Sequence, residues 1–146
     1  MNPKNKPTEL SYYGLYLLSY LLENHPDKAD DAEFIETRAD QAGETYEQAR
    51  REGYPAAGAH ELAMLTLLEG LYFSKYTLLT EVLENEFADE VPEEQIPTFA
   101  IQLLPLVENV FAIYSLSDDF AQSPEYDLLY TELTGAVVLY LEAYGV

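Results

Sequence analysis

Hydrophobic residues recur along this chain at spacings of three and four, which is the period of a helix that buries one face. The first such segment covers residues 9–24, and Thr8 is its expected N-cap. It should end at His25, because Pro26 disfavours helical backbone in the residue before it. Three tyrosines, Tyr12, Tyr16 and Tyr20, then share one face of this helix.

A second helix is predicted over residues 30–52, which are mostly polar. Its apolar positions form a narrow seam of mainly small residues, at Ala32, Ile35, Ala39, Ala42, Tyr46 and Ala49. Such a seam lets the backbone of another helix approach closely. Gly53 is expected to end the helix.

The longest helical pattern covers residues 59–87 and predicts one continuous helix, in which Gly70 could allow a bend. Apolar residues surround most of its circumference, which is typical of a central helix buried by several neighbours. They are Leu62, Leu65, Leu68, Leu71, Tyr72, Leu78, Leu79, Val82 and Leu83.

Two further helices are predicted after an acidic loop. Pro105 interrupts the segment 97–116 and should kink or split it. Ser123-Pro124-Glu125 combines an N-cap residue with proline at the first helical position, so the last helix is expected over 124–144. The sequence therefore predicts an all-α fold: a multihelical bundle of about five helices around the long central one, with a Pro-kinked fourth helix.

The length of 146 residues suits one domain, so a single helical domain is expected over 1–146, with residues 1–8 flexible. Tyrosines and a serine interrupt the leucines after residue 9, so no secretory signal is recognised and the cytoplasm is the expected location. The apolar stretch 96–116 carries Gln102, Pro105, Glu108 and Asn109, which hydrocarbon penalises. It is interpreted as a core segment, and no membrane association is expected.

The net charge of −20 is unevenly distributed along the chain. Residues 1–75 hold 13 acidic and all 7 basic residues, a balance of −6, whereas residues 76–146 hold 14 acidic residues and no base, a balance of −14. Nucleic-acid binding needs Lys and Arg to displace counterions, so direct binding to DNA or RNA is disfavoured. Docking on an anionic membrane is disfavoured for the same reason.

The usual patterns of catalytic and metal sites are missing from the sequence. Neither His25 nor His60 has a glutamate three residues before it, and there is no Gly-x-Ser-x-Gly, P-loop or dinucleotide fingerprint. No catalytic residue, cofactor or metal is therefore predicted. Carboxylates alone could bind a hard cation at Glu81 and Glu84, or near 89–94, but a solvated acidic face explains them better.

Three charged residues interrupt apolar helical patterns: Glu69, Lys75 and Glu108. An unpaired buried charge is costly, so they are candidates for a buried polar network. No carboxylate stands three or four residues from Lys75, and Glu108 is its expected partner. A structural ion pair, or a lysine that reaches the surface, is favoured over a binding site.

The chain has 13 tyrosines and no tryptophan, and many of the tyrosines stand four residues apart. Each offers an apolar ring and a hydroxyl that needs a partner. Two interpretations remain open: the margin of the core, which is favoured, or a surface that binds a partner.

Three stretches of the chain resemble an uncharacterised all-helical domain family of gut and oral anaerobic bacteria. They are residues 10–31 (LSYYGLYLLSYLLENHPDKADD), 38–53 (RADQAGETYEQARREG) and 59–87 (AHELAMLTLLEGLYFSKYTLLTEVLENEF). The resemblance implies an all-helical fold and an origin often linked to conjugative mobile elements. It implies no known activity and supplies no functional residues.

The function expected from these observations is a non-enzymatic protein-protein interaction module whose partner is another protein, with a link to mobile-element proteins suggested by the resemblance. A homo-oligomer stays open. One alternative is an acidic DNA mimic or decoy that presents carboxylates to a basic groove. The other is an enzyme or metal-dependent protein, which would need Glu69, Lys75, Glu108 or a histidine to converge in a pocket.

Overall fold

The computed structural model describes residues 11–146, and every element of secondary structure in that range is helical. The all-α class is therefore confirmed. Backbone contacts group the chain into two compact units, Met1–Glu69 and Gly70–Val146. The expected flexible segment 1–8 and the expected N-cap Thr8 lie outside the described residues. That the chain folds as one cooperative domain stays a prediction.

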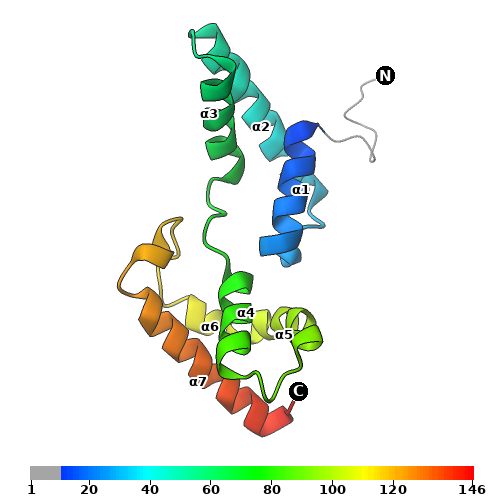
Figure 1. The fold of residues 1–146 in the computed structure, drawn as a ribbon, viewed down its shortest axis with the longest axis vertical. Helices are drawn as coiled ribbons and strands as arrows, with labels where there is room; N and C mark the ends of the chain where they lie inside the picture. The colour runs from blue at the N-terminus through cyan, green and yellow to red at the C-terminus, as the bar shows by residue number, and fades with distance from the viewer. Residues whose placement is uncertain (1–10) are drawn as a thin grey trace. The chain divides into compact units, whose positions relative to one another are not determined.

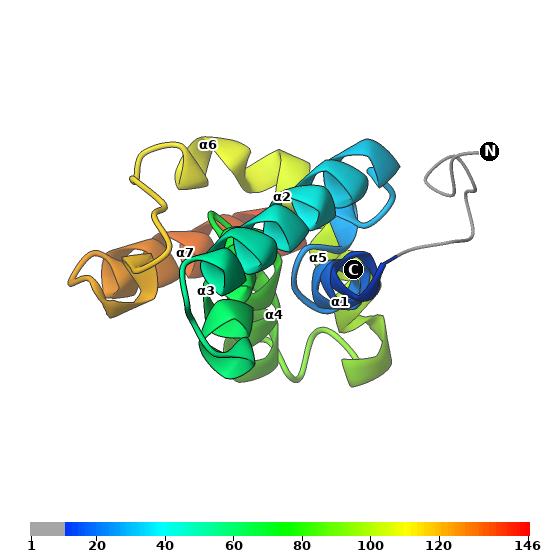
Figure 2. The same ribbon diagram turned by 90° about the horizontal axis from the view of Figure 1, so that it is seen from above.

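In the described part of the first unit there are three α-helices: α1 (Tyr12–Asn24), α2 (Ala32–Arg51) and α3 (Ala56–Leu68). The two ribbon views show α2 and α3 side by side, joined by a tight turn, with α1 packed beside α2 (Figures 1 and 2). Ser11 caps α1, since its side chain accepts a hydrogen bond from the Gly14 N–H. The predicted end of this helix before His25 is confirmed, whereas its start is three residues later than predicted, because Ser11 and not Thr8 is the N-cap.

Alanines fill the contact between α2 and α3. Ala42 on α2 and Ala59 and Ala63 on α3 are fully buried. Small side chains let the two helix backbones approach closely, as the seam on α2 predicted. Gly53 has a positive φ of 101°, a left-handed conformation that favours glycine, and turns the chain after α2 toward α3.

The long helix predicted over 59–87 is wrong. Helix α3 ends at Leu68 and α4 (Lys75–Glu86) begins after a non-helical segment, residues 69–74, which contains Gly70 at φ +79°. The side chain of Ser74 accepts a hydrogen bond from the Thr77 N–H and so starts α4 as its N-cap. The apolar pattern continues through the break because Leu71 and Phe73 are also buried, although they are not helical.

The second unit contains α4, α5 (Ile96–Leu103), a 3-10 turn (Leu104–Val107), α6 (Glu108–Phe111) and α7 (Tyr126–Tyr144). The interruption predicted at Pro105 is confirmed, because the 3-10 turn separates α5 from α6 there. Helix α7 begins two residues later than predicted. Ser123 does not cap it: the backbone carbonyl of Ser123 accepts from the Tyr126 N–H, and its hydroxyl has no hydrogen-bond partner within the described residues.

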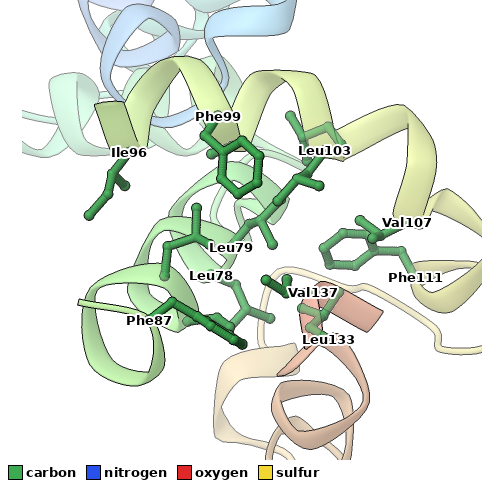
Figure 3. Close-up of a cluster of buried hydrophobic side chains, with 14 of the residues drawn as sticks. Leu78, Leu79, Phe87, Ile96, Phe99, Leu103, Val107, Phe111, Leu133 and Val137 are labelled. Atoms are coloured by element: carbon green, nitrogen blue, oxygen red, sulfur yellow. The ribbon is translucent and has the colours of Figure 1, made fainter. Parts of the chain in front are cut away.

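The core of the second unit is built where side chains of α4, α5 and α7 meet, and the fully buried ring of Phe111 from α6 joins this cluster beside Val107 (Figure 3). Leu79 comes from α4, Leu103 from α5 and Leu133 from α7, and none of these side chains is exposed. The apolar stretch 96–116 thus supplies core residues, as predicted. Of the helices within residues 11–146, none combines the length and apolar character that crossing a membrane requires.

Candidate functional site

Lys75 and Glu108 form an ion pair at the surface of the second unit. The Lys75 Nζ lies 2.8 Å from Glu108 Oε1, and the lysine also lies 5.5 Å from the centre of the Phe111 ring. The two side chains are 39% and 56% exposed. The structure therefore brings together two of the three residues of the predicted network, but it does not bury them.

Glu69 belongs to the first unit, whereas the ion pair of Lys75 and Glu108 lies in the second, so a network that joins all three residues stays a prediction. Glu69 follows the last residue of α3 in the first unit, and its side chain is exposed. Its backbone, not its side chain, makes the contact: the carbonyl of Glu69 accepts a hydrogen bond of 2.7 Å from Arg38. Glu69 interrupts the apolar pattern because the helix ends there, and a side chain beyond the helix end reaches water.

The two histidines pack against tyrosines of the first unit. His25 is buried at the C-terminal end of α1, with its ring 6.2 Å from that of Tyr20. His60 on α3 lies beside Tyr13, whose hydroxyl is 3.4 Å from His60 Nδ1. Burial raises the pKa of the Tyr13 hydroxyl, with smaller contributions from Tyr46 and Tyr12. His60 of α3 thus packs near the start of α1, whereas His25 lies at its end.

Metal-binding side chains do not gather anywhere in the part of the chain that the structure describes. Within residues 11–146, no group of three or more His, Cys, Asp or Glu residues is placed to hold an ion. Glu81, one of the carboxylates considered for a cation, instead accepts a hydrogen bond from the hydroxyl of Tyr126.

The segment between α3 and α4 is held by two charged residues that the sequence did not single out for this role. In the first unit, Arg38 donates to the carbonyls of Thr66, Leu67 and Glu69, which lie at the end of α3. In the second unit, the carboxylate of Asp118 accepts from the Gly70 N–H at 2.8 Å and the Tyr72 N–H at 3.1 Å. Arg38 and Asp118 bind backbone groups, which every residue type has. The spacing of residue types in the sequence therefore could not reveal these contacts.

Three tyrosine hydroxyls of the second unit donate hydrogen bonds to glutamates. Tyr126 and Tyr130 of α7 donate to Glu81 (3.2 Å) and Glu86 (2.9 Å) of α4. Tyr114 donates to Glu132 of α7 at 2.5 Å. The rings of Tyr114, Tyr126 and Tyr130 also pack against the buried core cluster. These tyrosines therefore lie at the margin of the core, while their hydroxyls hold surface carboxylates in place.

The surroundings of two of these hydroxyls raise their pKa values, for a different main reason in each. The bond to Glu132 is the main reason that the pKa of Tyr114 is raised to about 12. Burial, followed by the charge of Glu81, raises the pKa of Tyr126 to about 12. A phenolate beside a carboxylate would bring two negative charges together, so both hydroxyls stay protonated well above neutral pH.

Large apolar side chains are exposed on the outer faces of α1 and α7. On α1 they are Tyr12, Leu15, Tyr16 and Leu22, each between 41% and 60% exposed. On α7 they are Leu128, Val138, Leu139 and, at the C-terminal end of the helix, Tyr144. Each helix also has a fully buried inner face, formed by residues such as Leu17 on α1 and Leu133 on α7. The two helices therefore carry apolar residues on the face that their own unit does not cover.

A shallow groove of about 610 Å³ runs between α2 and α3. Glutamates, glutamines and threonines line most of it, and the hydroxyls of Thr45 and Thr66 lie 3.0 Å apart at its wall. Arg51 donates to Gln48 instead of pointing a free cation into the groove. Its polar groups largely bind one another, so the groove does not resemble a catalytic pocket.

Comparison with known proteins identifies a close structural counterpart. The crystal structure of protein PG0816 from Porphyromonas gingivalis matches 96% of this chain and 94% of its own chain, with 41% sequence identity and a TM-score of 0.89. No curated protein matches the chain. A family model described as a domain of unknown function, DUF1896, matches residues 5–146. The chain therefore belongs to this family of uncharacterised bacterial domains.

Proposed function

We propose that this chain is a non-enzymatic module that binds other proteins. The observation that carries the proposal is the outer face of α1, where Tyr12, Leu15, Tyr16 and Leu22 stand at spacings of three, one and six residues and share one side of the helix. Their exposed area is on the order of a few hundred Å², the size of apolar patch that on monomeric proteins is often functional.

The composition of this face also suits an interface. Tyrosine is enriched in the cores of protein interfaces, because its ring is apolar and rigid while its hydroxyl can still find a partner. Tyr12 lies against both Tyr13 and Tyr16, at ring distances of 5.3 and 6.4 Å, so the aromatic surface is held in place before a partner arrives. In a chain of net charge −20, α1 carries one charged residue, Glu23.

The partner class follows from the same features. A low-charge aromatic surface accepts another protein more readily than a nucleic acid or an anionic membrane, which the acidic chain repels. The family resemblance suggests proteins of conjugative mobile elements as the first to test. A second copy of the chain is the other protein partner that this face would suit.

Site-specific photo-crosslinking in the native host tests the proposal. A benzophenone amino acid replaces Tyr16 on the exposed α1 face, and the matched control places it at Glu47, an exposed position of α2. We expect a defined crosslinked protein from position 16 and none from position 47. Light scattering after size exclusion reports self-association of the purified chain. A monomer that yields no specific crosslink from position 16 or from an equivalent probe on α7 would contradict the proposal.

A second candidate function, an acidic decoy for a DNA-binding protein, is supported by the charge of the second unit. Residues 70–146 hold 14 acidic residues and one base, Lys75, and tyrosine hydroxyls fix the carboxylates of Glu81, Glu86 and Glu132. A decoy should compete with DNA for a basic nucleoid protein, and the competition should weaken as salt rises. Absence of competition at low salt excludes this function.

A further inference from the structure

We propose that the outer face of α7 binds a basic amphipathic helix of another protein. This inference rests on the proposed function as an interaction module and names a second surface and the chemistry of its partner. It concerns the second unit alone, and it is independent of which protein binds α1.

The first observation is the unpartnered side of α7. Leu128, Thr131, Gly135, Val138 and Leu139 follow one another at spacings of three, four, three and one, so they lie on one face of the helix. Leu128 is 58% exposed and Leu139 is 68% exposed. The opposite side is fully buried against the unit's own core through Leu129, Leu133 and Val137.

The shape of this face admits a helix. Helix α7 has 19 residues and is about 28 Å long, enough to support a partner helix over several turns. Gly135 lies in the middle of the face, and a side chain added there would meet nothing within 4 Å. A glycine flanked by exposed leucines leaves a shallow depression, in which the backbone of a second helix can approach closely.

The charges around this face favour a partner of positive charge. Asp127, Glu132 and Glu142 are exposed on the same side of α7. The hydroxyl of Tyr114 fixes the carboxylate of Glu132 at one edge. The single base of the second unit, Lys75, is already paired with Glu108. No basic side chain of this unit is therefore available to neutralise these carboxylates, and a helix with Lys or Arg beside its apolar stripe would do so.

The other occupants fit less well. A second copy packed through α7 would bring its own Glu132 and Glu142 into an interface that already holds these carboxylates and has no free base to pair with them, and like charges at an interface are costly. A nucleic acid would be repelled by the same groups. An uncharged apolar helix would gain nothing from the acidic edges, so it should bind more weakly than a basic one.

Fluorescence anisotropy with designed peptides tests the inference on the full chain. The probe is a labelled amphipathic helix of leucine and lysine. One control peptide has glutamate in place of lysine, and another has the leucine and lysine order scrambled so that no apolar stripe forms. We expect saturable binding of the first peptide alone, weakened several-fold when salt is raised from low to physiological concentration.

Variants locate the binding surface. Combining Leu128→Gln with Leu139→Gln removes the exposed apolar side chains and should weaken binding by about tenfold or more, as expected when apolar contacts at an interface centre are lost. Leu65→Gln is the matched control, because Leu65 lies on α3 and is also 58% exposed. It should change the affinity less than about twofold. Circular dichroism confirms that each variant stays helical.

Charge variants give a second, independent readout. Glu142→Lys should weaken binding at low salt, whereas Glu61→Lys on α3 should not. Equal binding of the scrambled peptide, or unchanged affinity in the double leucine variant, overturns the inference. The proposed function can survive that result, because crosslinking from α1 is unaffected. Conversely, peptide binding to α7 without any crosslink from α1 would support the α7 inference. It would also mean that the module binds its partners through α7 and not through α1.

Discussion

The guanidinium of Arg38 donates a hydrogen bond of 2.7 Å to the backbone carbonyl of Glu69, the residue directly after α3. The same nitrogen reaches the carbonyl of Leu67 at 3.0 Å, and the guanidinium lies over the ring of Phe34. The last carbonyls of a helix lack partners within it, so one arginine of α2 satisfies the end of α3 from the side. The helix can therefore stop at Leu68 although the apolar pattern continues.

Replacing Arg38 should destabilise the first unit. Arg38→Ala leaves these carbonyls without their protein donor and should lower the free energy of unfolding by about 1–2 kcal/mol. Arg51→Ala is the control, since Arg51 contacts the exposed side chain of Gln48 and should cost less than about 0.5 kcal/mol. Urea denaturation compares the two variants. Equal small losses would show that Arg38 does not stabilise the end of α3.

Replacing Asp118 should loosen the start of the second unit. Asp118→Ala removes both acceptors for the Gly70 and Tyr72 N–H groups and should cost about 1–3 kcal/mol. Amide hydrogen exchange gives the direct measurement, because these two amides should exchange faster. In the control Asp119→Ala, which removes a local bond from Ser117, they should exchange at the original rate. Unchanged exchange in both variants would argue against the role of Asp118.

Two glycine substitutions with opposite expected effects on stability test the break between α3 and α4. Gly70 has a φ of +79°, so Gly70→Ala should destabilise the chain by about 1 kcal/mol even though no atom would clash with the added carbon. Gly43 lies within α2, also with free space around it, and Gly43→Ala should stabilise by up to about 1 kcal/mol. Thermal unfolding decides. If both substitutions stabilise, α3 and α4 join as one helix after all.

The Lys75–Glu108 pair should contribute little to stability. Both side chains are partly exposed, so a double-mutant cycle with Lys75→Met and Glu108→Gln should give a coupling energy of about 0.2–1 kcal/mol. The ring of Phe111 beside the lysine adds at most a similar amount. A coupling of several kcal/mol would mean that water is excluded from the pair in solution.

The raised pKa values of Tyr114 and Tyr126 make stability depend on pH in the alkaline range. Both are about 12 in the folded chain and near 10 when unfolded, so the stabilisation is complete below pH 10 and is lost as the pH rises through 12. Glu132→Gln should lower the pKa of Tyr114, and Glu142→Gln should leave it unchanged. Nuclear magnetic resonance titration of labelled tyrosine measures both. A Tyr114 that titrates identically in all three proteins would contradict the hydrogen bond to Glu132.

The helices themselves could largely be predicted from the sequence, because capping residues, prolines and the spacing of apolar residues act locally. The alanine seam of α2 and the interruption at Pro105 are examples. The break at 69–74 was missed because its two causes are distant in sequence. Arg38 and Asp118 bind backbone groups 31 and 48 residues away, and such contacts leave no periodic signal. Ser74 was the local signal that could have revealed it, since it is followed by a helical pattern.

The candidate site residues show the same limit. Charge interruptions correctly pointed to Lys75 and Glu108 as neighbours, but sequence could not say that both reach the surface. The tyrosine pattern suggested either the margin of the core or a surface that binds a partner. Tyr126 and Tyr130 pack on the core, as the first interpretation expects, whereas Tyr12 and Tyr16 are exposed, and a partner bound there remains a proposal. Which tyrosines face outward depends on how the helices pack, and that is a property of the tertiary structure.

The position of Lys75 has a practical consequence for proteolysis. Trypsin cuts after lysine and arginine, and in the second unit its only target is this residue, in the first turn of α4 and paired with Glu108. A protease must unwind that turn before it can bind the chain in extended form. The rate of this single cleavage therefore reports how often the beginning of α4 opens, and everything after it is released as one uncut fragment.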